Sequence, residues 1–423
     1  MLDIKYIREH SEEVKKNCEN RLSSANIEEL LKLDEQRRKM IGEIDALRTA
    51  RNISSKSKPT PEEIEAIKQR KNKIGELEAE LLKLEEKYNE ELYKVPNLTH
   101  PEVVVSKNED DNPVLETYKE PTKFDFEPKD HVQLAETLDL IDFDRATKVT
   151  GSKFFYLKNE LALLEFALTQ YCLEILYKKG FTPMITPDLA KQEILKAMGY
   201  NPRGESTQIY NIENSDLSLI GTAEITMGGY HSGEVLDETE LPKKYVAVSH
   251  CFRTEAGSYS KYSKGIYRVH QFTKVEMFQY VKPENSEITH KELLEIEKEI
   301  YKGLDIPFRV VDHCTADLGT PVIRTHDLEA WMPGKPNKDG KAGDWAEITS
   351  TSNCTDYQAR ALNIKYKKAD GSKEFVHMLN GTASSTNRPL IAILENYQQA
   401  DGSIKIPEVL QKYLPGELKH IKR

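Results

Sequence analysis

The 423-residue sequence has no long hydrophobic run and only five cysteines. No apolar stretch approaches the roughly 20 residues that a helix needs to span a bilayer, so no membrane segment is expected. The cysteines are odd in number and scattered, and no two of them form a Cys-x-x-Cys pair. This pattern argues against a disulfide framework and against a structural zinc site. A reducing cytoplasm is therefore the expected location.

The sequence also lacks the usual glycine-rich phosphate loops. Neither G-x-G-x-x-G nor G-x-x-x-x-G-K-[ST] occurs, so a nucleotide would have to be held by other groups. The net charge of -10 and the pI of about 5.7 argue against indiscriminate nucleic-acid binding. Phosphate contacts need clustered Lys and Arg, and a local basic patch is still compatible with an acidic chain.

Residues 27–94 have the pattern of two long helices joined by a break. Mostly apolar side chains recur at spacings of three and four residues, which is typical of the seam of an antiparallel two-helix coiled coil. The seam consists of Leu30, Leu33, Arg37, Met40, Ile44 and Leu47, followed by Ile67, Ile74, Leu77, Leu81, Leu84 and Tyr88. Between the two sets, "NISSKSKPTPEE" supplies small polar residues, two prolines and a helix start at Pro61. Such an arm is too thin to enclose a substrate.

The charge of this arm changes along its length. Residues 37–73, around the tip, carry eleven basic and five acidic side chains, whereas residues 74–94 carry three basic and seven acidic ones. A basic tip on an acidic protein suits an extended polyanion. An ordinary solvated coiled coil with ion pairs along its surface fits the same pattern, so charge alone does not decide between the two.

The sequence changes character after the arm. Residues 95–122 are rich in proline and acidic side chains and are typical of a linker, which predicts domains at 1–104 and 105–423. Beyond it come an amphipathic helix, "NELALLEFALTQYCLEILYKKG", and strands at "FTPMITP", "YVAVSHCFR", "RVHQFTKVEMFQYV", "FRVVD" and "DWAEITSTS". Clustered strands with few intervening helices predict an α+β fold in which helices flank an antiparallel sheet.

A strand-loop-strand unit at residues 252–278 is the first candidate for chemistry. Alternate residues of a strand share a face, so Arg253 and Glu255 are expected to point one way, and Phe272, Lys274 and Glu276 to point together. Cross-strand ion pairs on an exposed sheet would explain the charges. The aromatic ring among them, beside a loop rich in Lys, Tyr and Ser, favours a nucleotide instead. The ring can stack on a base while an Arg binds phosphate through two hydrogen bonds.

Two further segments add groups of the same kind. "GDWAEITSTS" places Glu347 and Ser350 on a strand, and a carboxylate and a hydroxyl suit a Mg²⁺ ion that keeps most of its waters. In "HMLNGTASSTNRPLIAILENYQ", Asn380-Gly381 is expected to form a turn, and Arg388 precedes Pro389 at the expected first turn of a helix. An arginine at that place could bind a polyphosphate.

Taken together, these segments resemble class II aminoacyl-tRNA synthetases, and among them the bacterial-type seryl-tRNA synthetase family. Motif 1 of the class is similar to the helix and strand that end in "GFTPMITPDL", motif 2 to "FRTEAG…YRVHQFTKVEMF" and motif 3 to "NGTASSTNRPLIAILENYQ". "GTAEI", residues 221–225, resembles the serine-specific TxE element. The helical arm resembles the tRNA-binding domain of that family, so the resemblance covers nearly the whole chain.

The resemblance implies a role for each matching residue. For ATP it implies Arg253, Thr254, Glu255, Val269, Phe272, Glu347, Ile348, Thr349, Ser350 and Arg388. For L-serine it implies Thr222, Ala223, Glu224, Arg253, Glu276 and Thr382. Arg253 and Arg388 are the implied catalytic residues, and Glu347 and Ser350 are the implied Mg²⁺ ligands.

The resemblance also implies a reaction and partners. Serine would attack ATP to give seryl-adenylate and pyrophosphate, and the 3' end of tRNA(Ser), bound by the arm, would then accept the seryl group. Whether tRNA(Sec) is also charged stays open. A homodimer is implied, because motif 1 forms the dimer interface in the class.

Two alternatives remain at this point. A class II relative could charge a carrier protein instead of tRNA, but it would not need a basic arm. A catalytically inactive paralogue that only binds tRNA would be expected to lose phosphate-binding arginines or Mg²⁺ ligands, and Arg253, Arg388, Glu347 and Ser350 are all present.

Overall fold

The computed structural model describes residues 1–54, 60–200, 208–256 and 262–423. The chain divides into two compact units, Met1–Leu98 and Thr99–Arg423. The expected break of the arm at residues 55–59 and the Lys-, Ser- and Tyr-rich loop at 257–261 lie outside the described residues. None of the helices described is long and apolar enough to cross a membrane.

The first unit is helical. Its elements are α1 (Ile4–Glu9), α2 (Ser11–Asn20), α3 (Ile27–Ser54) and α4 (Pro61–Lys94). Ion pairs join Arg37 to Glu85 at 3.0 Å and Arg48 to Glu78 at 2.8 Å, so later residues of α3 face earlier residues of α4. The two long helices therefore run antiparallel, and the predicted hairpin with a helix start at Pro61 is confirmed.

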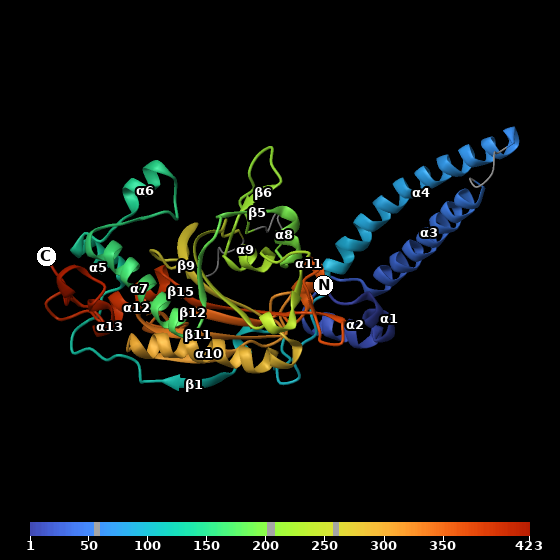
Figure 1. The fold of residues 1–423 in the computed structure, drawn as a ribbon. Coiled ribbons are helices and arrows are strands. Elements are labelled where there is room, and N and C mark those ends of the chain that lie inside the picture. Colours follow the sequence, from blue (N-terminus) through green and yellow to red (C-terminus); the bar gives the residue numbers. More distant parts are fainter. Residues whose placement is uncertain (55–59, 201–207, 257–261) are drawn as a thin grey trace. The chain divides into compact units, whose positions relative to one another are not determined.

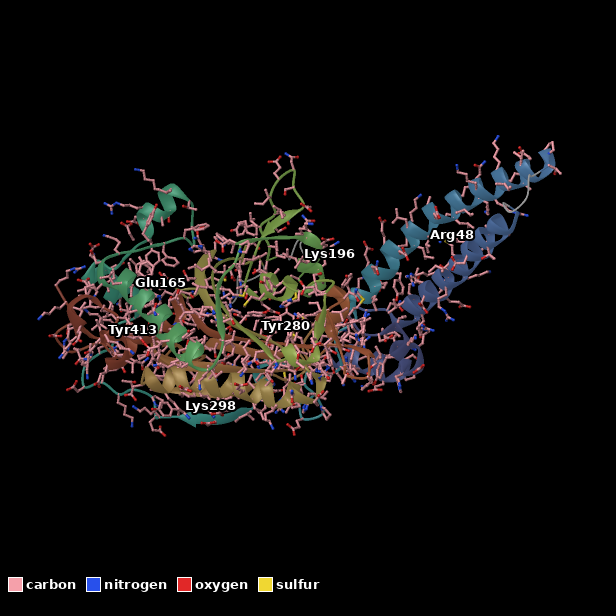
Figure 2. The ribbon with its side chains drawn as sticks, viewed as in Figure 1. Arg48, Glu165, Lys196, Tyr280, Lys298 and Tyr413 are labelled. Atoms are coloured by element: carbon pink, nitrogen blue, oxygen red, sulfur yellow. The ribbon has the colours of Figure 1, made fainter. Side chains whose placement is uncertain are left out.

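The described interior of this helix pair is a small apolar cluster. Ile44, Ile74 and Leu77 are buried against each other at positions that the spacing of three and four residues predicts. The outer faces carry charged groups, among them Arg48, along both helices (Figure 2). Two helices that pack through so small a cluster contact each other but leave no room for a substrate between them.

The second unit is built on one large sheet, in which the described residues supply eight strands in the order β1-β10-β11-β12-β15-β9-β8-β4. Their bounds are β1 Val114–Tyr118, β4 Thr182–Ile185, β8 Lys243–Phe252, β9 Gln271–Val281, β10 Phe308–Asp312, β11 Arg324–Pro336, β12 Ala342–Asn353 and β15 His377–Ser385. All neighbours pair antiparallel except β4 and β8, which are parallel. The predicted α+β class is confirmed.

Smaller sheets of two or three strands, and helices, complete the unit. The strands are β2 Ile141–Asp142, β3 Tyr156–Leu157, β5 Leu189–Lys191, β6 Leu217–Leu219, β7 Val235–Asp237, β13 Lys365–Lys367, β14 Lys373–Phe375, β16 Ile404–Lys405 and β17 His420–Ile421. The helices are α5 His131–Leu138, α6 Phe143–Val149, α7 Asn159–Lys178, α8 Gln192–Ala197, α9 Glu224–Gly229, α10 Ser286–Gly303, α11 Tyr357–Leu362, α12 Asn387–Asn396 and α13 Glu408–Gln411.

The two faces of the large sheet are covered differently. Helices α7, α10 and α12 pack on one face, and α10 runs along it in Figure 1. Val275 and Met277 of β9 point into the hydrophobic core formed there. On the other face, Phe278 and Tyr280 of the same strand pack under α8, α9 and α11. The remainder of that second face holds the candidate site.

Three expectations about local structure need correction. Asn380 and Gly381 do not form a turn but lie inside β15, paired with β9 and β12. Arg253 and Glu255 are not on a strand, because β8 ends at Phe252. The segment expected to be a linker contains β1, whose pairing with β10 makes it the edge of the sheet. An Asn-Gly pair predicts a turn only where the chain is free to reverse. Here pairing with strands on both sides keeps the segment extended.

Candidate active site

Strand β9 supplies one wall of the site. Phe272, Lys274 and Glu276 alternate along it and share the face opposite the core residues Val275 and Met277, as predicted. Phe272 and Lys274 line an open cavity, while Glu276 is fully buried beside it. The regular alternation of a strand therefore places an aromatic ring, an ammonium and a carboxylate in one row.

The segment after β8 adds a guanidinium and a second carboxylate. The guanidinium of Arg253 lies 5.3 Å from the centre of the Phe272 ring, and its Nε donates to the carbonyl oxygen of Gly221 at 3.2 Å. Glu255, three residues beyond the end of β8, has a left-handed backbone with φ of 52°. Its buried carboxylate accepts a hydrogen bond from Arg268 Nη1 at 2.9 Å. Both Arg253 and Glu255 still line the cavity, although strand alternation does not place them there.

A bulge in β12 brings Glu347 and Ser350 to the same face. Two residues that are three positions apart would point to opposite faces of a regular strand. Here Glu347 pairs with Glu329 and Thr349 with Leu328, so Ile348 is an extra residue and the alternation is reset. The Thr349 hydroxyl turns to the helix side, where it donates to Glu297 Oε2 at 2.7 Å.

The start of α12 completes the cationic side of the cavity. Arg388 lies in the first turn of this helix, as predicted, and its Nη1 is 2.9 Å from Glu347 Oε1. Its guanidinium also lies over the ring of Tyr267, 4.8 Å from the ring centre. Arg388 and Arg253 are thus held over separate aromatic rings that both belong to the cavity lining.

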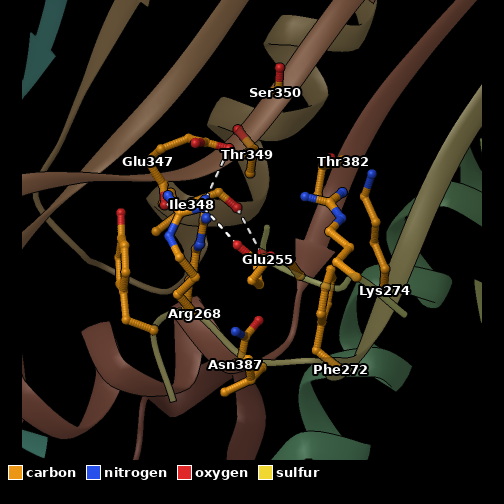
Figure 3. Close-up of a pocket in the computed structure, with 15 residues that line it drawn as sticks. Glu255, Arg268, Phe272, Lys274, Glu347, Ile348, Thr349, Ser350, Thr382 and Asn387 are labelled. Carbon is orange, nitrogen blue, oxygen red and sulfur yellow. Dashed lines mark hydrogen bonds and ion pairs between the residues drawn. The ribbon is translucent and has the colours of Figure 1, made fainter. Parts of the chain in front are cut away.

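The cavity gathers most of the predicted nucleotide residues (Figure 3). The predicted residues on its lining are Arg253, Glu255, Val269, Phe272, Glu347, Ile348, Thr349, Ser350, Thr382 and Arg388. The predicted residues that do not line it are Thr222, Ala223, Glu224, Thr254 and Glu276. Thr254 follows Arg253 directly and its backbone N–H donates to the carbonyl oxygen of Gln208. The other four form a group on one side of the cavity.

Lys274 connects that group to the cavity. Its ammonium donates to Thr222 Oγ1 at 3.1 Å and forms an ion pair with Glu276 Oε2. Burial raises the pKa of Glu276 to about 7, although the neighbouring Lys274 opposes the shift. The other carboxylate oxygen, Oε1, is buried and has no hydrogen-bond partner among the described residues. A buried acceptor without a partner is costly, so this oxygen is available to a donor on a ligand.

Glu224 is fixed by residues from distant parts of the chain. It is the first residue of α9, directly after the buried Ala223, and its carboxylate accepts from Tyr200 Oη and from Gln358 Nε2, each at 2.9 Å. Its backbone N–H donates to Thr222 Oγ1 at 3.3 Å. The two side-chain donors fix the carboxylate in one orientation.

Some lining and supporting residues were not predicted from the sequence. Tyr267, Arg268, Ser385 and Asn387 line the cavity, and Tyr200 and Gln358 support Glu224 from outside it. Tyr267 and Arg268 stand within the same strand-loop-strand unit as the predicted residues, so their position was a usable signal. Tyr200 and Gln358 lie 24 and 134 positions from Glu224, and no local pattern marks them.

Known proteins share this architecture. A family model described as "tRNA synthetase class II core domain (G, H, P, S and T)" matches residues 208–397, and one described as "Seryl-tRNA synthetase N-terminal domain" matches residues 1–99. The antiparallel sheet with its open face and cavity is thus the core of a class II aminoacyl-tRNA synthetase. The chain belongs to the seryl-tRNA synthetase family.

Individual relatives match over their full length. The serine–tRNA ligase of Treponema denticola is 53% identical and that of Dictyoglomus thermophilum is 50% identical, each over 98% of this chain and 98% of the relative. The crystal structure of seryl-tRNA synthetase from Pyrococcus horikoshii complexed with ATP is 40% identical, with a TM-score of 0.87. That likeness covers 100% of this chain and 99% of the other.

Proposed function

We propose that the chain is a serine–tRNA ligase that activates L-serine with ATP and transfers it to the 3' end of tRNA(Ser). The observation that carries this proposal is Glu276 Oε1, a buried carboxylate oxygen without a partner among the described residues, next to a cavity with two arginines. A small substrate with a hydroxyl donor satisfies that oxygen, and a polyphosphate satisfies Arg253 and Arg388.

In the first step an oxygen of the serine carboxylate attacks the α-phosphorus of ATP. The bond from that phosphorus to the bridging oxygen breaks, and pyrophosphate leaves with the electron pair. The nucleophile is already an anion, so the protein has to position the reactants and stabilise phosphate charge. We assign the α-phosphate and the serine carboxylate to Arg253, and the γ-phosphate to Arg388.

The adenine is assigned to the part of the cavity that Phe272, Glu255 and Val269 line. Phe272 provides a ring for stacking, Glu255 an acceptor for the exocyclic amino group, and Val269 backbone contact. Thr254, Ile348 and Thr349 are assigned to the same nucleotide through the segments that carry them. This assignment leaves the group beside the cavity for the amino acid, namely Thr222, Ala223, Glu224 and Glu276.

Glu347 and Ser350 are the residues we propose for Mg²⁺. The bulge at Ile348 sets them on one face, and a carboxylate with a hydroxyl suits an ion that takes its other ligands from phosphate and water. Asp327, paired with Ser350 in the strand register, has one buried carboxylate oxygen without a hydrogen-bond partner among the described residues, which favours a cation nearby. A bound Mg²⁺ ion supplies neutralisation of phosphate charge.

Serine selectivity follows from the buried carboxylates. The serine ammonium is assigned to Thr222, Ala223 and Glu224, and the hydroxyl to Glu276 and Thr382. Alanine would leave the buried Glu276 Oε1 without a hydrogen-bond donor, and sites of this kind reject the analogue by roughly 10⁴-fold. Threonine adds one methyl group, whose exclusion normally supplies about 1–3 kcal/mol.

In the second step the 3'-terminal ribose hydroxyl of tRNA attacks the seryl carbonyl carbon, an ester forms and AMP leaves. We assign tRNA binding to residues 1–104, through the helix pair, and catalysis to residues 105–423. A homodimer and a cytoplasmic location remain part of the proposal. Charging of tRNA(Sec) would use the same arm and the same adenylate.

The test is ATP–pyrophosphate exchange with serine, alanine, threonine and cysteine, on the whole chain and on a variant lacking residues 27–94. Serine-dependent exchange is expected in both, with tRNA charging lost only in the shortened chain. Charging of a carrier protein in place of tRNA would support the carrier-charging alternative. No exchange with any of the four amino acids would overturn the proposal in favour of an inactive tRNA-binding protein.

A further inference from the structure

A buried histidine outside the assigned site packs against segment 264–266, which leads into that site. His131, the first residue of α5, is fully buried. Its Nδ1 lies 2.9 Å from Glu395 Oε1, and its Nε2 accepts the backbone N–H of Ile266 at 3.4 Å. Because Nε2 accepts, the ring proton is on Nδ1 and is donated to the carboxylate of Glu395.

Three contacts hold the segment 264–266 from different sides. The backbone N–H of Ile266 donates to His131, and its carbonyl oxygen accepts from Asn387 Nδ2 at 2.8 Å. Lys264 is paired with Asp130, the residue that caps α5, at 2.5 Å. We call these contacts of His131, Asn387 and Asp130 the loop clamp. A fully buried Ile266 with both backbone groups bonded leaves this segment one conformation.

Both ends of α12 are joined to the clamp, one through Asn387 and the other through the bond of Glu395 to His131. Asn387 is the first residue of this helix, and Glu395 is close to its last residue, Asn396. The Glu395 carboxylate also accepts the backbone N–H groups of His131 at 3.0 Å and of Gly334 at 2.8 Å. The helix that carries Arg388 and the segment that leads to Tyr267 are therefore fixed to each other at two separate points.

Segment 264–266 lies so close to the start of α5 that position 265 has to be a glycine. Gly265 has a φ of 59°, and a Cβ there would lie 2.1 Å from His131 Nε2 and 2.7 Å from Val132 Cγ2. Only glycine fits, because the backbone conformation and the histidine ring both exclude a side chain. The ring of His131 is thus in direct packing contact with the segment as well as hydrogen-bonded to it.

The residues that follow the clamp belong to the nucleotide end of the cavity. Tyr267 lies under Arg388, Arg268 donates to Glu255, and Val269 is buried in the lining. We propose that His131 is a positioning residue for ATP. Through Glu395 and Ile266 it fixes residues 267–269 and Arg388 relative to each other. This inference rests on the proposed function, since it assumes that the cavity binds ATP.

The clamp adjoins Tyr267 and Arg388 in the chain, and its hydrogen bonds and ion pair involve none of the residues assigned to serine. His131→Leu removes both ring hydrogen bonds and leaves the Glu395 carboxylate with one partner fewer. We expect the KM for ATP in pyrophosphate exchange to rise about tenfold, with the KM for serine unchanged within twofold. His131→Gln offers an acceptor to Ile266 again and should recover most of the ATP affinity. Calorimetric titration of the full chain with ATP should show the same order of variants.

A matched control separates positioning from a general loss of stability. His231 is also buried, with Nδ1 at 2.7 Å from Glu234 and Nε2 at 2.9 Å from Tyr245 Oη. Among the described residues, its hydrogen bonds and ring contacts involve neither segment 264–269 nor α12. His231→Leu should lower stability comparably and leave the KM for ATP unchanged. An equal rise of the ATP KM in both leucine variants would overturn the proposal.

A milder variant covers the case in which His131→Leu does not fold. The Lys264 side chain is 49% exposed, so Lys264→Met removes one arm of the clamp without opening the core. A rise of two- to threefold in the ATP KM with an unchanged serine KM supports the clamp, and no change in either contradicts it. If the unmodified chain itself shows no serine-dependent exchange, the proposed function fails, and calorimetric ATP binding by the variants then tests the clamp alone.

Discussion

On the helix pair of the first unit, Arg48 and Glu78 form an ion pair whose side chains are 50% and 47% exposed. In the sheet of the second unit, Lys274 and Glu276 form one whose side chains are 10% and 1% exposed. Exposed pairs contribute about 0–1 kcal/mol because water screens them. Buried pairs lose several kcal/mol of hydration for each ion, so their retention needs a reason other than stability. Binding a polar substrate is such a reason.

Glycines show the same contrast in packing. At Gly42 and Gly75, inside α3 and α4, no atom beyond the adjacent residues and the helix's own nearby backbone lies within 4 Å of the place where a Cβ would stand. At Gly381 in β15, that Cβ would lie 3.0 Å from Met277 Cε and from Thr351 Oγ1. A side chain at either of these two positions of the helix pair would therefore meet open space, whereas at Gly381 the sheet is filled up to the backbone.

The strongest test of the comparison is Glu276→Gln. The amide keeps the size of the side chain but replaces the ionised acceptor beside Lys274. We expect serine-dependent pyrophosphate exchange to fall roughly 100-fold, about 2.7 kcal/mol of transition-state stabilisation. Calorimetric ATP affinity should be unchanged, because Glu276 does not line the nucleotide cavity. Unchanged exchange would remove Glu276 from the serine site.

Its control and its pH dependence sharpen the result. Glu292 on α10 is a partly exposed partner of Lys244, and Glu292→Gln should alter exchange less than twofold. With a pKa of about 7, Glu276 is mostly protonated at pH 6 and mostly ionised at pH 8. The ionised form is the stronger acceptor, so kcat/KM for serine should rise up to about tenfold over this range. Glu276→Gln should show no such rise, and a parallel rise in the variant would assign the titration to another group.

The parts that the sequence predicted well are those with a local cause. The spacing in α3 and α4 and the alternation of Phe272, Lys274 and Glu276 are properties of one helix or strand, so neighbouring residues determine them. The Asn380-Gly381 turn failed because strand pairing with distant residues outweighed a local preference. Ile348 could not be recognised as a bulge without the register of β11.

The same reasoning explains what was missed at the site. Tyr200 and Gln358 reach Glu224 from separate segments, and only the folded chain brings them together. The left-handed backbone of Glu255 also had no local signal, because glutamate gives no preference for it. The family resemblance gave Arg253, Phe272 and Glu347 roles in ATP binding, and the structure places all three on the lining of one cavity, while the roles themselves stay predictions.

The next prediction concerns packing in the sheet. Gly381→Ala adds a methyl group against Met277, Thr351 and the buried Glu297 Oε1, which would lie 3.1 Å away. Overpacking of a filled interior costs about 1–3 kcal/mol, so the free energy of unfolding should fall by that amount. Both tryptophans, Trp331 and Trp345, belong to the second unit, so urea unfolding followed by their fluorescence measures it. An unchanged midpoint would mean that β15 moves freely enough to admit the methyl group.

The smallest expected effect has the opposite sign and lies in the first unit. Gly42→Ala places a methyl group in open space on α3, where alanine favours the helix over glycine by about 0.5–1 kcal/mol. Amide hydrogen exchange in the middle of α3, on the full chain, should slow by about two- to fivefold, and Gly75→Ala should do the same for α4. A faster exchange in either variant would show that these glycines permit a bend or a contact that the helix pair requires. In that case Gly42 and Gly75 would also be constrained, and they would differ from Gly381 only in the kind of constraint.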